Sequence, residues 1–339
     1  MKSQSSAQRS LAYRTIPARQ ENTDLRHKRV FDSVVDLIAN PDNPTPMVRL
    51  SDRYNSAENF DIFVKLEAFN PFGSIKDRTA LYLLRGTQLT EGQVLAEPTA
   101  GNTGIALAAL ANAQGIPIEL AVPDGTPEEK KVLLRFLGAE LLEVEDEMCP
   151  LFPTEGARGV IKSMVESAAF NGKYVSPNQY ENELNVEAHY RTTGPEIWNQ
   201  TGGDIDYFFA AFGTCGTITG VGRYLKERNP NIKIIGIEPS SREHKLSGIK
   251  KISDLPDEFK PKILDYSLID EIIAVDDRDA YEAGIQLART EGIMVGPTTG
   301  ALLHAARQVS ANASGRAVVI SPDDATKYIS AYAEYLEQE

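Results

Sequence analysis

One lysine and three glycine-rich segments carry the residues of this chain that could do chemistry. Lys76 follows a small, flexible approach, Gly73-Ser74, at the start of a predicted helix. A primary amine in such a place can bond covalently to an aldehyde and can later act as a base. The glycine-rich segments each follow an apolar, strand-like run, and they occupy residues 97–104, 213–220 and 296–301. Together the four segments suit a bound phosphorylated aldehyde better than a nucleotide.

The segment Gly213 to Gly220 is predicted to hold the phosphate. It follows a very apolar strand and opens a helix, so backbone N–H groups and the positive end of the helix dipole can surround an anion there. A dinucleotide site is the alternative, because Glu238 ends the next strand where a ribose-binding acid would stand. The glycine spacing is G-x-x-G-x-x-x-G rather than G-x-G-x-x-G, and this favours the phosphate cup.

The four segments, in this order, resemble those of the cysteine synthase and cystathionine β-synthase family, the pyridoxal phosphate (PLP) enzymes of fold type II. The resemblance extends from about Val34 to Tyr328. It implies an α/β protein with the two-domain PLP fold type II, like the tryptophan synthase β-subunit, in which parallel-rich sheets are flanked by helices. It also implies PLP as the cofactor, small-molecule amino-acid substrates and a homodimer.

The resemblance gives a role to each matching residue. Lys76 is implied to bind the cofactor covalently and to remove the α-proton of the substrate. The other implied cofactor-binding residues are Asn102 at the ring hydroxyl, Thr298 at the pyridine nitrogen, and the phosphate loop Gly213, Thr214, Cys215, Gly216 and Thr217. The implied substrate-binding residues are Thr99, Ala100, Gly101, Thr103 and Gln179, which face the substrate carboxylate.

Several of these positions depart from the family pattern or have a purely structural explanation. Cys215 stands where the family usually has glycine, and Ala100 where most cysteine synthases have serine. Gly101-Asn102 could form only a turn and a helix cap, and Thr298 could cap the helix that starts at Gly300.

The resemblance implies β-replacement on an activated L-serine, O-phosphoserine or O-acetylserine, by way of α-aminoacrylate. Sulfide or another thiol, with a sulfur-donor protein as a possible partner, would then give L-cysteine or a related amino acid. The alternatives are a cystathionine β-synthase that uses homocysteine, an enzyme with an amine nucleophile, and an inactive PLP-binding homologue. The basic residue Lys250 and the stretch 324–328 resemble phosphoserine-dependent cysteine synthases, which implies that Lys250 binds the phosphate of the donor. The alternative is that Lys250 and Lys251 are solvated surface charges.

Strand-like and helix-like runs alternate along the chain, which predicts βαβ units and parallel sheets. The predicted strands are 61–66, 94–96, 116–122, 141–144, 206–212, 232–237, 272–275, 293–295 and 317–320, and the predicted helices are 75–85, 103–113, 127–137, 154–170, 217–227, 278–290 and 301–309. We expect a basic arm at 1–30, a small domain at 70–180, and a large domain that combines 31–69 with 181–339. The cofactor would lie between the two domains.

Composition limits the classes of partner. The net charge of −13 argues against nucleic acid, which needs a basic face, and no apolar run approaches the length of a membrane helix. Residues 1–29 are different, with seven basic and two acidic side chains, and could be an arm or a transit peptide. Two cysteines give no disulfide framework, and the four histidines show no metal-ligand spacing, so we expect a cytoplasmic protein without a metal.

Overall fold

The computed structural model describes residues 30–99, 101–145 and 155–336, and their architecture is built on two sheets. The larger sheet has six strands in the order β1-β2-β10-β7-β8-β9. Only β1 runs antiparallel to its neighbour, and the other pairs are parallel. Its strands are β1 (Met47–Arg49), β2 (Phe60–Leu66), β7 (Tyr207–Ala211), β8 (Lys233–Pro239), β9 (Glu271–Val275) and β10 (Gly315–Ser321).

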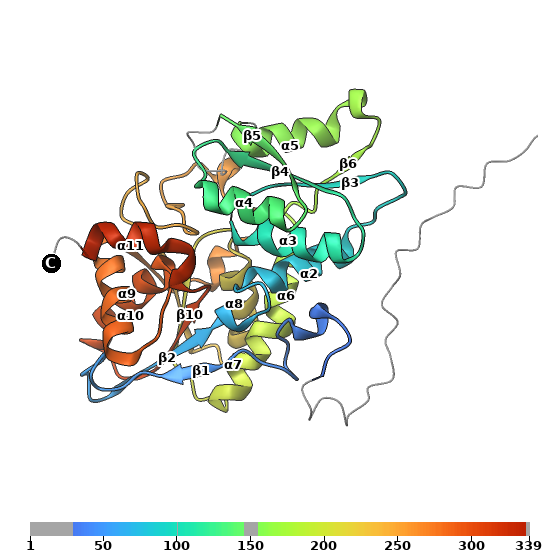
Figure 1. Ribbon diagram of the computed structural model, residues 1–339. Helices are drawn as coiled ribbons and strands as arrows, with labels where there is room; N and C mark the ends of the chain where they lie inside the picture. The colour runs from blue at the N-terminus through green and yellow to red at the C-terminus, as the bar shows by residue number, and fades with distance from the viewer. Residues whose placement is uncertain (1–29, 100, 146–154, 337–339) are drawn as a thin grey trace, which may run out of the picture.

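The smaller sheet has four parallel strands in the order β5-β4-β3-β6. In Figure 1 it lies with its helices in the upper part of the molecule, away from β1, β2 and β10. Its strands are β3 (Val94–Pro98), β4 (Ile118–Pro123), β5 (Glu140–Val144) and β6 (Tyr174–Val175).

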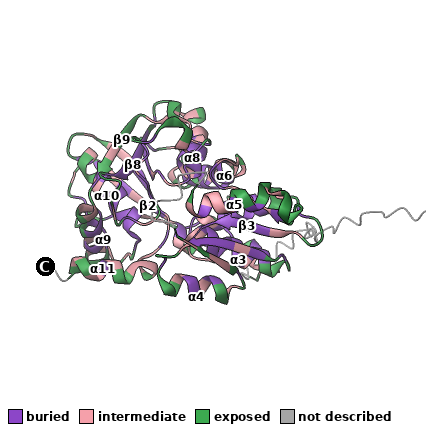
Figure 2. Cartoon of the chain, turned by 90° about the horizontal axis from the view of Figure 1, so that it is seen from above, coloured by how far each residue is buried: buried purple, intermediate pink, exposed green. Residues whose placement is uncertain are grey.

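Helices cover both faces of each sheet, which is why the central strands are apolar along their whole length. On the larger sheet, α9 and α10 pack on one face and α8 on the other. On the smaller sheet, α2, α3 and α4 cover one face and α5 the other. Figure 2 shows the result, with buried strands β3 and β8 and exposed outer surfaces on α4 and α5.

The principal helices are α2 (Lys76–Gly86), α3 (Asn102–Ala113), α4 (Glu128–Phe136), α5 (Gly156–Glu166), α6 (Leu184–Ala188), α7 (Gly194–Thr201), α8 (Gly216–Arg228), α9 (Asp277–Glu291), α10 (Pro297–Ser310) and α11 (Ile329–Leu336). Seven of these helices, α2 to α5 and α8 to α10, correspond to predicted helices, whereas α6, α7 and α11 were not predicted. The predicted α/β class with parallel-rich sheets is confirmed. No helix in the described ranges has the length and apolar character that crossing a membrane requires.

Three parts of the predicted element order were wrong or missing. Residues 293–295 form no strand, because they connect α9 to α10 and pair with no neighbour. The predicted helix 154–170 ends at Glu166 and is followed by a short 3-10 turn, Ala168–Phe170. The sequence analysis also missed β1, β6, α6, α7, α11 and the π-helical turn His189–Thr193 between α6 and α7.

Candidate active site

Lys76 is the first residue of α2, and the loop before it is held on both sides. The Lys76 N–H donates to Ser74 Oγ at 3.2 Å, and the Phe72 N–H donates to Asp77 Oδ2 at 2.6 Å. The Ile75 N–H donates to the carbonyl of Pro322, just beyond β10, at 2.8 Å. The loop that carries Lys76 is therefore fixed to the end of the larger sheet.

The environment of Lys76 favours its neutral amine. Burial is the main cause, and it lowers the pKa of Lys76 from 10.5 to about 8, although the nearby Asp323 carboxylate opposes the shift. A neutral amine is the form that attacks an aldehyde or accepts a proton. Lys76 is thus suited to both of the roles that the family resemblance implies.

The loop between β7 and α8 brings several backbone N–H groups together at the start of α8. Within the described part of the chain, the N–H groups of Thr214 through Thr217 donate to no protein acceptor. Cys215 precedes α8 with φ of 70°, in the left-handed region that favours glycine. A Cβ at Gly216 would lie 2.2 Å from Asn185 Oδ1, so no side chain fits there. Unpaired N–H groups at a helix N-terminus form an anion site.

Two residues that the sequence analysis did not include among its site residues, Asn185 and His189, join this loop to α2. Asn185 Nδ2 donates to Thr214 Oγ1 at 3.0 Å, and Asn185 Oδ1 accepts from Thr79 Oγ1 at 3.0 Å. His189 Nε2 lies 3.2 Å from Thr79 Oγ1 and 3.3 Å from Thr217 Oγ1. Burial holds the pKa of His189 well below its usual value, so the imidazole is neutral. The predicted phosphate loop and the lysine helix are therefore parts of one hydrogen-bonded unit.

The residues expected at the substrate carboxylate gather beside this unit. Thr103 Oγ1 donates to Gln179 Oε1 at 2.7 Å, and Asn185 Nδ2 donates to the Gln179 carbonyl at 2.8 Å. Thr99 Oγ1 accepts from the N–H groups of Gly101 and Gly104, each at 3.3 Å. Ala100 lies outside the described residues.

Thr298 does not cap a helix, which corrects one of the alternatives above. It lies in the first turn of α10, and its Oγ1 donates to the carbonyl of Ser247 at 2.9 Å. The neighbouring Gly248 connects this position to the phosphate loop, because a Cβ on Gly213 would lie 2.7 Å from the Gly248 carbonyl oxygen. Thr298 and Gly213 therefore flank the same short segment.

Lys250 and Lys251 are not solvated surface charges. Lys250 is 8% exposed, its N–H donates to the Phe212 carbonyl at 2.7 Å, and its charge acts on Cys215. Lys251 Nζ lies 2.9 Å from Glu238 Oε1. Glu238 Oε2 also accepts from the N–H groups of Ile252 and Ser253 at 3.0 Å, so it anchors this loop. Glu238 is committed to protein contacts and does not serve as a ribose-binding acid.

Asn102 is the first residue of α3, and its side chain contacts a segment that follows β10. Asn102 Nδ2 donates to Asp323 Oδ2 at 2.6 Å, and Lys327 Nζ donates to Asn102 Oδ1 at 2.9 Å. Asp323 and Lys327 were not among the site residues read from the sequence. No spacing signal could have found them, since 221 residues separate Asp323 from Asn102.

The donor set matches what PLP requires. The unpaired N–H groups at the start of α8 suit a phosphate dianion, and the amine of Lys76 suits the aldehyde. The hydroxyl of Thr298 and the amide of Asn102 are polar groups on neighbouring segments that suit the ring nitrogen and the ring hydroxyl. Among the described residues, no group of three or more His, Cys, Asp or Glu side chains is arranged to hold a metal ion.

Comparison with known proteins agrees with this geometry. The family described as pyridoxal-phosphate dependent enzyme matches residues 38–323. The chain is 38% identical over 317 residues to a cysteine synthase of Aquifex aeolicus, an alignment that covers 90% of this chain and 93% of the relative. It is 39% identical over 292 residues to cysteine synthase B of Escherichia coli, covering 84% of this chain and 92% of the relative.

Solved structures show the same architecture. Cysteine synthase from Entamoeba histolytica superposes with a TM-score of 0.79 at 30% identity, covering 89% of this chain and 90% of that chain. O-ureido-L-serine synthase superposes with a TM-score of 0.77 at 31% identity, covering 89% and 94%. The chain therefore belongs to the cysteine synthase family of pyridoxal-phosphate dependent enzymes, as the four sequence segments indicated.

Proposed function

We propose that the enzyme replaces the β-substituent of an activated L-serine, with PLP held on Lys76. The observation that carries the proposal is the amine of Lys76, with its pKa lowered to about 8, in one hydrogen-bonded unit with a loop of unpaired N–H groups. Bound PLP supplies the electron-withdrawing ring that makes the substrate Cα–H acidic. Lys76 holds the cofactor in the resting enzyme and takes the α-proton once the substrate has displaced it.

The other site residues bind the cofactor and orient the substrate. The loop from Gly213 to Thr217 holds the cofactor phosphate, Asn102 donates to the ring oxygen, and Thr298 faces the ring nitrogen. The substrate carboxylate binds at the start of α3, to Thr99, Gly101 and Thr103. It also contacts Gln179, which accepts a hydrogen bond from Thr103. The hydrogen bond between Thr103 and Gln179 supports this arrangement, because it places two polar side chains together beside the phosphate loop.

The nucleophile we propose is sulfide or another thiol, with L-cysteine or a related amino acid as the product. The relatives named cysteine synthase support this choice. A protein that delivers sulfur is a possible partner. The neighbour named O-ureido-L-serine synthase is the reason to test nucleophiles without sulfur as well.

For the leaving group we propose phosphate, bound by Lys250. The support is its burial at 8% exposure beside the phosphate loop, within 5.9 Å of the Tyr180 ring centroid. A charge-assisted hydrogen bond to the departing phosphate would contribute roughly 1.5–3 kcal/mol. Values of kcat/KM for O-phosphoserine and O-acetylserine test this in wild type and Lys250→Ala. A preference for phosphoserine that the variant loses supports the assignment, and equal losses on both donors reject it.

The site itself is tested by covalent trapping. Borohydride reduction of the protein with PLP, followed by peptide mapping, should place the pyridoxyl group on Lys76. Modification of a different lysine, or no bound cofactor after reconstitution, rejects the proposed function. Turnover of the donors with sulfide, thiosulfate, homocysteine and amines then identifies the second substrate and separates an active enzyme from an inactive homologue.

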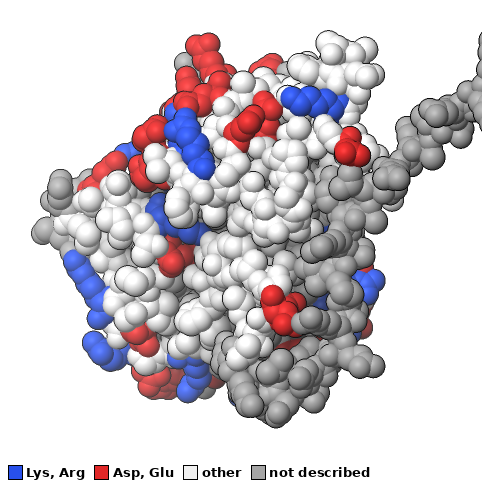
Figure 3. Space-filling model, turned by 45° about the vertical axis from the view of Figure 1, so that its right-hand side comes forward, with Lys and Arg blue, Asp and Glu red and all other residues white. Residues whose placement is uncertain are grey.

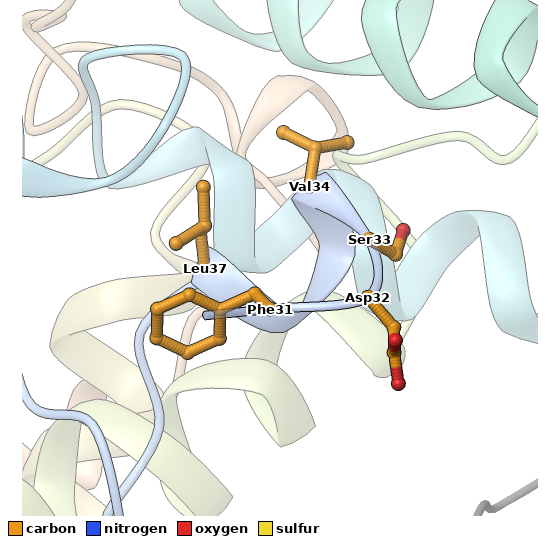
Figure 4. A pocket seen from close by; sticks show the side chains of 5 residues that line it. All are labelled: Phe31, Asp32, Ser33, Val34 and Leu37. Carbon is orange, nitrogen blue, oxygen red and sulfur yellow. The ribbon is translucent and has the colours of Figure 1, made fainter. Parts of the chain in front are cut away.

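At the scale of the molecule we propose a small domain at 70–180, a large domain from 31–69 and 181–339, a homodimer, and a cytoplasmic location. The dimer has support from an apolar surface near the N-terminus. Phe31 and Leu37, drawn in Figure 4, line a hollow. The volume of this hollow is about 490 Å³, and Phe69 nearby is 66% exposed. Asn70 accepts from the Ala39 N–H at 3.0 Å, so these two segments adjoin. Sedimentation of wild type and Leu37→Asp tests the interface.

A further inference from the structure

The segment from Pro322 to Tyr328 lies against the lysine loop and the start of α3. Ser74 and Asp323 form an isolated antiparallel bridge, and the Ile75 N–H donates to the Pro322 carbonyl at 2.8 Å. Lys327 Nζ donates to the Gly73 carbonyl at 2.9 Å. The segment therefore contacts the loop that carries Lys76 from two directions.

The same segment binds both polar atoms of the Asn102 side chain. Asp323 accepts from Nδ2 at 2.6 Å, and Lys327 donates to Oδ1 at 2.9 Å. These two contacts fix which way the amide faces, because a carboxylate cannot donate and an ammonium cannot accept. The second N–H of Asn102 Nδ2 interacts with the hydroxyl of Tyr328, which would have to yield it to a ligand.

The local backbone is shaped for these contacts. Gly73 has φ of 76°, and a Cβ there would lie 3.3 Å from Lys327 Nζ. Asp323 is 4% exposed and accepts from Tyr328 OH at 2.5 Å. A Cβ on Gly296 would lie 2.1 Å from Asp323 Oδ1, so glycine there leaves room for the carboxylate. Asp323 and Lys327 are thus built into the site and are not incidental surface charges.

We propose that Lys327 is a positioning residue for the cofactor, which acts through Asn102 to stabilise the deprotonated ring oxygen. The inference rests on the proposed function, in which the second N–H of Asn102 donates to that oxygen. An ammonium on the amide oxygen draws electrons away from the amide nitrogen, so its N–H becomes a stronger donor. The fixed orientation also keeps this N–H, rather than Oδ1, toward the ring.

The test measures the absorbance of the bound cofactor as a function of pH, together with the cofactor dissociation constant. Lys327→Met and Lys327→Gln remove the charge, and the second keeps a polar group in case the first does not fold. Both should raise the midpoint of the absorbance titration by about one pH unit. They should also weaken cofactor binding by roughly tenfold. Lys327→Arg keeps the charge and should restore most of both properties.

Lys130→Met is the matched control. Lys130 Nζ lies 5.1 Å from the Tyr328 ring centroid, beside the same segment. Among the described residues, no hydrogen bond joins it to Asn102. Its loss should leave the midpoint in place. If Lys327→Met or Lys327→Gln binds the cofactor on Lys76 with an unchanged midpoint, Lys327 only ties two segments together and the inference is wrong. Failure of the wild type to bind PLP on Lys76 rejects the proposed function instead.

Discussion

At the scale of single residues, Cys215 holds a backbone conformation that its side chain opposes. Its φ of 70° places it in the left-handed region, in the middle of the phosphate loop and just before α8. This conformation turns consecutive N–H groups toward one point, which explains why the family usually has glycine here. Burial raises the pKa of the thiol to about 12, so it stays protonated and is a poor nucleophile.

Substitutions at this position should separate the backbone strain from the thiol. Cys215→Gly and Cys215→Ala both lose the sulfur, but only glycine relieves the left-handed strain. We expect the glycine variant to be more stable than the alanine variant by about 1 kcal/mol. Urea denaturation of the cofactor-free proteins measures the difference. Equal midpoints would mean that the loop relaxes without strain.

The lowered pKa of Lys76 predicts a pH dependence of stability in the cofactor-free protein. Burial depresses the pKa from 10.5 to about 8, so between these values the unfolded chain binds more protons than the folded one. Stability should therefore rise as the pH increases from about 8 to 10.5. Below that window, Lys76→Met should raise the melting temperature by about 2–4 °C, since it removes a buried charge. Calorimetry across this range should show that the gain in melting temperature of Lys76→Met becomes smaller as the pH rises. A gain that stays constant contradicts the explanation.

Residue chemistry predicted part of the candidate site, and the structure adds Asn185, His189, Asp323 and Lys327 to it. Lys76, Cys215 and Thr298 lie in glycine-containing segments, and the local sequence pattern of these segments predicts site residues. Lys327 lies in the stretch 324–328 that resembles phosphoserine-dependent cysteine synthases, but no site role was given to it or to Asp323, and only the fold brings them to Asn102. Motifs report on local backbone requirements, whereas the supporting contacts come from distant strands, so the sequence could not indicate them.

At the scale of secondary structure, a buried ion cluster anchors α2 two residues beyond Lys76. Arg78 donates to Glu67 Oε2 at 2.7 Å and to Glu196 Oε2 at 2.8 Å, and Lys65 Nζ lies 2.7 Å from Glu196. All four side chains are fully buried. Burial alone would raise the pKa of Glu67, but the charges of Arg78 and Lys65 outweigh it and lower the pKa to about 2.

Removing Arg78 should leave two carboxylates in the interior with one cation. We expect Arg78→Met to reduce the free energy of unfolding by about 3–5 kcal/mol. The control is Arg135→Met on α4, where Arg135 pairs with Glu128 and Glu143 while 46% exposed. That substitution should change stability by less than about 1 kcal/mol. Urea denaturation compares the two, and similar losses would show that the cluster does not anchor α2.

The same cluster predicts that the protein loses stability at acid pH. A carboxylate whose pKa is lowered on folding stabilises the protein above its usual pKa, and this contribution is lost as the pH falls through the window below it. For Glu67 the window runs from 4.5 down to about 2. The free energy of unfolding of wild type should fall with pH in this window more steeply than that of Glu67→Gln, measured by urea titration at each pH. If the stability of wild type and of Glu67→Gln depends on pH in the same way, Glu67 is not the cause of the loss.

The alternation of strands and helices could be read from the sequence because each parallel strand is a buried apolar run. The same signal failed at 293–295, where Val295 is 1% exposed but belongs to a connector. Apolar content alone does not distinguish a buried connector from a strand. The π-helical turn His189–Thr193 was missed for a different reason, since its hydrogen-bond pattern depends on packing against α8.

At the scale of the whole molecule, the candidate site joins two separately packed units. Asn102 and Thr103 begin the helix that follows β3 of the smaller sheet, whereas Gly213 to Thr217 follow β7 of the larger one. Each sheet has its own apolar clusters. The face in Figure 3 shows charged side chains mainly toward the edges, with an uncharged middle and no continuous basic patch.

A ligand that contacts both units should make them unfold together. In the proposed site, PLP would contact both Asn102 and the phosphate loop and add contacts that neither unit has alone. At 100 times its dissociation constant it should stabilise the folded state by about 2.7 kcal/mol. We expect calorimetry of the cofactor-free protein to show a broad or split transition, and the PLP-bound protein a single sharper one at higher temperature. Inorganic phosphate contacts only the loop before α8, so it should raise the temperature of one component without merging the two. A single, equally sharp transition in the cofactor-free protein would mean that existing contacts such as Asn102–Asp323 already couple the units.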